Sequence, residues 1–133
     1  MKTIQFILFL TIILSKFAIG QDSDCLGIDK NNILNKHESL FLTKQINNSF
    51  DFNNKKIAFY KSLVGYQSKQ DFFKESKEFI KKGQTLSLQI IILTETEKNE
   101  TRGFNAILVS WSKKTVTTKM RNKLIDELKK AST

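Results

Sequence analysis

Two glutamates two positions apart are the residues best suited to acid–base chemistry. Glu95 and Glu97 follow a run of strand-forming residues, and side chains two apart on an extended strand share a face. Two carboxylates on one face can act as general acid and general base. Such a pair needs surroundings that separate the two pKa values, and the polar stretch around it carries no signal of burial. Glu95 and Glu97 are therefore catalytic candidates by spacing alone.

The sequence lacks the motifs that mark other catalytic or metal sites, although serine, histidine and aspartate are all present and composition alone leaves a Ser-His-Asp triad open. His37 is the only histidine and Cys25 the only cysteine, so a site built from several His or Cys ligands is excluded. The chain also has no Gly-x-Ser-x-Gly elbow and no glycine-rich phosphate loop. We predict no metal site and no cofactor, and we expect His37 on the apolar face or rim of a helix.

Two polar loops supply candidates for ligand binding. Residues 62–68 contain Ser62, Tyr66 and Ser68, and residues 95–103 contain Glu100 and Arg102. If both loops follow parallel strands, they emerge at one edge of the sheet, where open α/β sheets bind ligands. The alternative is that both are ordinary solvated loops.

Lysine pairs are the most repetitive chemical feature of the chain. The net charge is +9, and lysine outnumbers arginine by 20 to 2. The pairs at 81–82 and 129–130 end predicted helices, where the helix dipole favours cations. The pairs without that explanation are polyanion-binding candidates: Lys55, Lys56, Lys113 and Lys114. Their partner would be a polyanion such as anionic lipid, an acidic polysaccharide or nucleic acid, although the charge also serves solubility. The shortage of arginine argues against sequence-specific recognition of nucleic acid.

Six elements in the order α-β-α-β-β-α are expected to position these residues. Apolar periodicity predicts helices over 33–46, over 68–82 and from Thr117 or Thr118 to the lysine pair at 129–130, and strand formers cluster at 56–62, 86–94 and 104–112. Ser68 and Asp71 predict a capping box at the start of the second helix, in which the Asp71 side chain reaches back to the cap, and Gly83 predicts the end of the helix. The nearly all-apolar stretch 86–94 is typical of a strand covered on both faces.

These elements predict an α/β fold, with α+β as the alternative. The fold would hold a small mixed sheet of about three strands with helices packed on it. The strand–helix–strand unit over 56–94 favours a right-handed crossover with its two strands parallel, either adjacent or separated by one strand. The third strand would run antiparallel to the second.

The first twenty residues have the pattern of a secretory signal peptide. Lys2 precedes an apolar run over 4–14, and Ala18 and Gly20 form a small-residue cleavage site. Residues 21–30 would be a polar lead-in and 31–133 a single domain, with no membrane span after cleavage. Cleavage removes two lysines and reduces the net charge from +9 to +7. Cys25 would be an incidental residue near the new terminus, and an intermolecular disulfide is the alternative.

The sequence therefore favours a small, basic, exported binding module over an enzyme. Its place would be the periplasm or the extracellular space, and its partner a protein or an acidic envelope component. The module would be a monomer or a weak dimer. The alternative is a small secreted enzyme of the hydrolase type, with its site at loops 62–68 and 95–103.

Export has a direct test. Mass spectrometry of the protein recovered outside the cytoplasm should find a mature form that begins at Gln21. Membrane-bound protein that still carries Met1 would contradict the signal-peptide interpretation.

Overall fold

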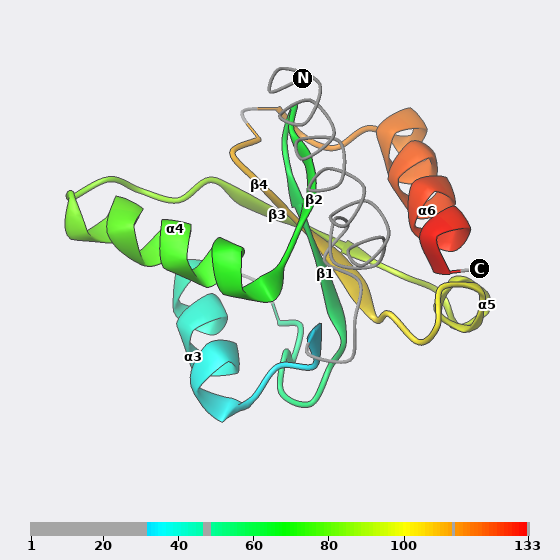
Figure 1. Cartoon of the computed structure of the whole chain (residues 1–133), viewed down its shortest axis with the longest axis horizontal. Coiled ribbons are helices and arrows are strands. Elements are labelled where there is room, and N and C mark those ends of the chain that lie inside the picture. Colours follow the sequence, from blue (N-terminus) through cyan, green and yellow to red (C-terminus); the bar gives the residue numbers. More distant parts are fainter. Residues whose placement is uncertain (1–31, 47–48, 113, 133) are drawn as a thin grey trace, which may run out of the picture.

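The computed structural model describes residues 32–46, 49–112 and 114–132. The predicted signal peptide, the lead-in with Cys25, and Lys113 lie outside the described residues. The described part is a mixed α/β fold, as the sequence predicts, with a four-stranded sheet (Figure 1).

The sheet has the strand order β2-β1-β4-β3. Its strands are β1 (Ile57–Lys61), β2 (Gly65–Gln67), β3 (Leu88–Ile92) and β4 (Ala106–Ser110). β1 is antiparallel to β2 and parallel to β4, and β3 is antiparallel to β4. The antiparallel pairing of the last two strands confirms the prediction. β2 was expected to be part of a loop, because three residues beginning with glycine give no strand signal.

Helices cover both faces of the sheet, which gives three layers (Figure 1). α3 (Lys36–Gln45) and α4 (Lys69–Lys81) lie on one side, and α5 (Glu95–Glu100) and α6 (Thr118–Ser132) lie on the other. Alternate residues of β1 and β4 face the two layers. Phe59 and Leu108 pack with Phe72 of α4, whereas Ala58 and Ile107 pack with Leu124 of α6.

The predicted parallel crossover between residues 56–62 and 86–94 is wrong. β1 and β3 both pair with β4, but β1 is parallel to it and β3 is antiparallel, so β1 and β3 run in opposite directions. The physical reason is the short hairpin of β1 and β2. The turn at 62–64 reverses the chain, and β2 carries it back along β1. α4 therefore begins at the end of the sheet where β1 starts, and not at the end where β1 stops.

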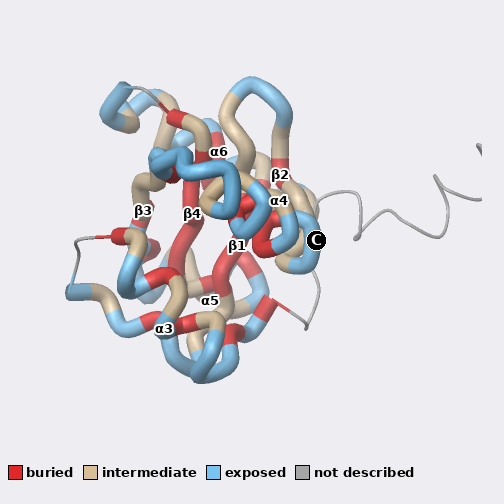
Figure 2. The backbone as a smooth tube through the Cα atoms, turned by 90° about the vertical axis from the view of Figure 1, so that its left-hand side faces the viewer, coloured by how far each residue is buried: buried red, intermediate tan, exposed pale blue. Residues whose placement is uncertain are grey.

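The strand covered on both faces is β4, and not β3 as the sequence predicts. All five residues of β4 are buried, whereas Ile92 of β3 is 50% exposed. Figure 2 shows this difference as a red β4 beside a largely tan β3. β4 lies between two strands, while β3 is at the edge of the sheet, and this order depends on pairing that composition does not specify.

α3 begins later than expected and presents a different face. Asn35 caps it, because the Asn35 side chain accepts a hydrogen bond from the Glu38 N–H and Glu38 bonds back to the Asn35 N–H. Ser39 and Leu42 are buried, whereas His37 is exposed. His37 is therefore not packed in the core, because the buried face includes Ser39 in its place. It lies at the rim, where it lines a hollow with Phe41 and Phe73.

α4 begins and ends where its sequence signals predict. Ser68 Oγ accepts a hydrogen bond of 3.0 Å from the Asp71 N–H, which is one half of the predicted capping box; at this cap the Asp71 carboxylate does not bond back to the Ser68 N–H. At the other end Gly83 has a φ of +78°, its N–H donates to the Ile80 carbonyl, and the Gln84 N–H donates to the Phe79 carbonyl. These two bonds form a Schellman motif, which satisfies carbonyls that the helix itself leaves free.

Removing the cap of α4 should destabilise the domain. Ser68→Ala is expected to lower the free energy of unfolding by about 0.5–2 kcal/mol, the usual loss at an N-cap, measured by urea denaturation. Ser68→Asn is the matched control, because asparagine also caps helices and should retain most of the stability. Equal losses in both variants would show that the cap is not the cause.

Candidate functional site

The two predicted ligand loops leave the sheet at opposite ends. Lys61, the last residue of β1, lies at the level of Ser110, whereas Ile92, the last residue of β3, lies at the level of Ala106. The length of a five-residue strand, roughly 13 Å, therefore separates the two exits. The expectation that the loops meet at one edge is wrong, because it required β1 and β3 to be parallel.

Residues 62–68 form the β1–β2 hairpin and the start of α4. The Ser62 N–H donates to the Ser110 carbonyl, and Ser68 is the cap of α4. Tyr66 is buried, and its hydroxyl donates a 2.6 Å hydrogen bond to the Leu124 carbonyl of α6. Burial, followed by the charge of Glu127, raises the pKa of Tyr66 well above its usual value. Tyr66 therefore joins the hairpin to α6, and its hydroxyl is already engaged.

A groove of about 640 Å³ lies between this hairpin and the first half of α6. Tyr60, Ser62, Leu63 and Val64 line one side, and Thr117, Lys119, Met120 and Lys123 line the other. Its lining combines aliphatic and aromatic side chains with two lysines and contains no acidic residue. Of the ligand candidates from the sequence, Ser62 lies in this groove.

Residues 95–100, expected to be part of a polar loop, form the short helix α5. Thr94 caps it, since Thr94 Oγ1 accepts from the Glu97 N–H at 3.2 Å and the Thr94 N–H donates to Glu97 Oε1 at 2.9 Å. The sequence contains the signal for this cap, a threonine followed three residues later by glutamate.

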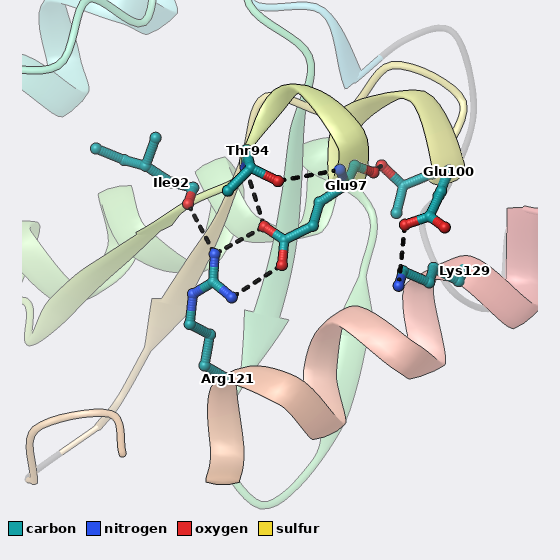
Figure 3. Close-up of polar contacts among 7 residues, drawn as sticks. Ile92, Thr94, Glu97, Glu100, Arg121 and Lys129 are labelled. Atoms are coloured by element: carbon teal, nitrogen blue, oxygen red, sulfur yellow. Dashed lines mark hydrogen bonds and ion pairs between the residues drawn. The ribbon is translucent and has the colours of Figure 1, made fainter. Parts of the chain in front are cut away.

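Arg121 of α6 holds Glu97 in a two-pronged ion pair (Figure 3). Its two terminal nitrogens lie 2.9 and 2.7 Å from the two carboxylate oxygens, and one of them also donates to the Ile92 carbonyl at 3.2 Å. Hydrogen bonds from Arg121 are the largest cause that lowers the pKa of Glu97 from 4.5 to about 2. A carboxylate held in this way stays ionised at neutral pH and is poorly matched to proton transfer.

The other candidate site residues of 95–103 lie apart from one another. Glu95 is exposed at the first position of α5, and residues two apart on a helix lie about 200° apart around its axis, so Glu95 and Glu97 do not share a face. Glu100 pairs with Lys129 at 3.1 Å. Arg102 is exposed, and its carbonyl accepts a bond from Lys56. The structure does not bring these residues together as a site.

The described lysines predicted to bind a polyanion, Lys55, Lys56 and Lys114, also lie at opposite ends of the sheet. Lys55 and Lys56 precede β1, and Lys114 follows β4, which is parallel to it. Lys56 has a structural role, because its ammonium bonds the Arg102 carbonyl at 3.0 Å and lies 4.5 Å from the centre of the Phe104 ring. Lys114 is exposed at the same end of the sheet as the hairpin.

Lys119 and Lys123 are basic residues that sequence reasoning missed. Both are exposed on α6, four positions apart and therefore on one side of the helix. Neither lysine belongs to a dibasic pair, so the repeated lysine pairs of the sequence give no signal for them. Opposite these lysines lie Leu63 and Val64 of the hairpin. They belong to the segment 62–68, in which only the serine and tyrosine residues carry a sequence signal for ligand binding.

Two negative findings concern the described part of the chain alone. Within residues 32–46, 49–112 and 114–132, no three His, Cys, Asp or Glu side chains gather as a metal site would require. None of the helices in those ranges has the length and hydrophobicity needed to cross a bilayer.

The Glu97–Arg121 pair should make stability depend on acid pH. Because folding lowers the pKa of Glu97, its contribution is complete above about pH 4.5 and is lost as the pH falls towards about 2. Glu97→Gln should therefore flatten the pH dependence of the unfolding free energy in that window. A double-mutant cycle with Arg121→Ala should give a coupling of about 1 kcal/mol at pH 7. No coupling at pH 7 would mean that the ion pair does not contribute to stability.

Comparison with known proteins gives a family and no named relative. Residues 30–130, from before α3 to the last turns of α6, match the family described as Domain of unknown function (DUF8192). Neither the curated proteins nor the solved structures contain a match to the chain. Because the matched segment includes all four strands and most of the chain, this protein belongs to the DUF8192 family.

Proposed function

We propose that this chain is an exported, non-catalytic binding module that meets an acidic partner through a basic surface. The observation that carries the proposal is a set of exposed lysines at the end of the sheet where β1 and β4 terminate. We call this surface the basic end, and it consists of Lys114, Lys119 and Lys123.

The lysines of the basic end take no part in the ion pairs of the described residues. Among the described residues, the ion pairs join Lys61 to Glu75, Lys69 to Glu38, Arg121 to Glu97 and Lys129 to Glu100. No described acid forms an ion pair with a lysine of the basic end. Glu127 lies four residues after Lys123 on α6, on the same side of the helix. Burial, followed by the charge of Glu127, raises the pKa of Tyr60 in the groove, so Glu127 offsets part of the positive charge beside Lys123. An exposed cluster of one sign attracts ligands of the opposite sign over a long range.

Export is supported by the N-terminal sequence, with its lysine, short apolar run and small-residue cleavage site. An acidic polysaccharide or anionic lipid of an envelope is a partner that an exported protein meets.

The geometry gives less support to the alternative, a hydrolase-type enzyme. That hypothesis needs loops 62–68 and 95–103 to form one site, but they leave the sheet at opposite ends. Of its two candidate carboxylates, Glu97 is committed to Arg121. A binding module requires neither arrangement.

Removing two lysines from the basic end should weaken binding to a polyanion. With heparin as the probe, affinity should fall steeply with added salt, because exposed charges are screened within about 8 Å at 0.15 M. Lys119→Gln combined with Lys123→Gln should lower the affinity about thirtyfold at low salt, since each lysine near an anionic surface contributes about 1 kcal/mol and every 1.4 kcal/mol is about tenfold.

The control for this test is Lys36→Gln combined with Lys44→Gln. These exposed lysines lie on α3, on the other side of the sheet, and their removal changes the net charge by the same amount. The control should bind nearly as well as the parent chain. Equal losses in both double variants would indicate a response to net charge alone, and an absence of binding at low salt would refute the proposed function.

A further inference from the structure

The β1–β2 hairpin presents two aliphatic side chains at its tip. Leu63 is 99% exposed and Val64 is 74% exposed, the two highest values among the large apolar residues exposed in the described chain. Figure 2 shows the connection to β2 as a pale blue loop that projects beyond the strands. Single exposed apolar residues are common, but two adjacent ones at a projecting tip are typical of an interaction site.

The backbone holds this tip in a fixed shape. The Val64 N–H donates to the Lys61 carbonyl at 3.0 Å, and the Ser62 N–H donates to the Ser110 carbonyl at 2.9 Å. Leu63 has a φ of 68°, in the left-handed region that glycine or asparagine adopts at lower cost. Leu63 therefore carries backbone strain, and because its side chain is not buried, it does not contribute to the stability of the domain.

Positive charge lies directly beside the tip. Lys119 and Lys123 line the opposite side of the groove that Leu63 and Val64 line, together with Met120. Lysines of this kind extend an apolar stem along a hydrophobic surface and place the ammonium group among anionic head groups. The molecule therefore presents an apolar tip with cations beside it at one end of the sheet.

We propose that this end of the molecule binds a membrane surface rich in anionic lipid. Leu63 and Val64 enter the boundary between head groups and acyl chains, and Lys119 and Lys123 contact the lipid phosphates. This assignment rests on the proposed function, whose acidic partner it specifies. A free polysaccharide would use the lysines but leave the tip in water, and an apolar pocket on a protein would use the tip but not the lysines. An anionic bilayer uses both.

Co-sedimentation with vesicles tests the proposal. The exported chain should bind vesicles of phosphatidylglycerol and phosphatidylcholine, and should bind vesicles of phosphatidylcholine alone much more weakly. Leu63→Ser combined with Val64→Ser should lower the partition coefficient about tenfold or more, because two aliphatic side chains no longer leave water. The fold should be unaffected, since both side chains are exposed.

Leu40→Ser is the matched control for the tip variant. Leu40 is an aliphatic residue, 51% exposed on α3 across the sheet, and its change should leave vesicle binding unaltered. Insertion is tested by Leu63→Trp, whose fluorescence brominated lipids should quench, whereas Leu40→Trp should respond no more than the parent chain with Trp111.

The outcomes separate the two proposals. If heparin binding is salt-dependent but the tip variant binds anionic vesicles as well as the parent chain, the membrane assignment is overturned and the proposed function stands. An unquenched tryptophan at position 63 also overturns insertion. If neither heparin nor anionic vesicles bind at low salt, both proposals fail.

Discussion

Burial of β4 is the constraint on which the rest of the structure depends. Four of its residues are fully buried and Ser110 is nearly so, because β1 and β3 pair with its two edges and helices cover both faces. Burial of a side chain such as Ile107, Leu108 or Val109 contributes about 1.5–3 kcal/mol to the stability of the fold. β4, together with its parallel neighbour β1, contributes residues to both hydrophobic cores, one beneath α3 and α4 and one beneath α6.

Two polar contacts then fix the position of α6 on this sheet. The Tyr66 hydroxyl bonds the Leu124 carbonyl from the hairpin side, and Arg121 bonds Glu97 and the Ile92 carbonyl from the other side. The sequence indicated Tyr66 as a candidate for ligand binding and Glu97 as a candidate for catalysis. Their chemistry is directed inwards, to the packing of one helix, whereas Lys119 and Lys123 on α6 and the hairpin tip at Leu63 and Val64 are exposed.

The character of that surface follows from how charge is distributed in the fold. Acidic side chains are used in ion pairs along α3, α4 and α5, whereas the first turns of α6 carry Lys119 and Lys123 without such partners among the described residues. The hairpin places Leu63 beside them. An apolar tip and a basic flank in one place give a physical basis for attraction to an anionic surface that net charge alone does not supply.

The sequence by itself determined the features that depend on neighbouring residues. The Ser68 cap, the glycine at the end of α4, the three longer helices and the mixed α/β class could all be predicted, because capping and apolar periodicity act over a few residues. The Thr94-x-x-Glu97 signal of α5 was also present, although the polar composition around it favoured a loop.

Only the tertiary structure decided which candidates share an end of the sheet. A three-residue strand after a tight turn reversed the chain before α4, and this reversal separated loop 62–68 from residues 95–103 and Lys55 from Lys114. It also left Leu63 at an exposed tip opposite Lys119, two residues that are 56 positions apart in the chain. Strand order and direction arise from pairing between distant segments, and composition and periodicity carry no record of that pairing.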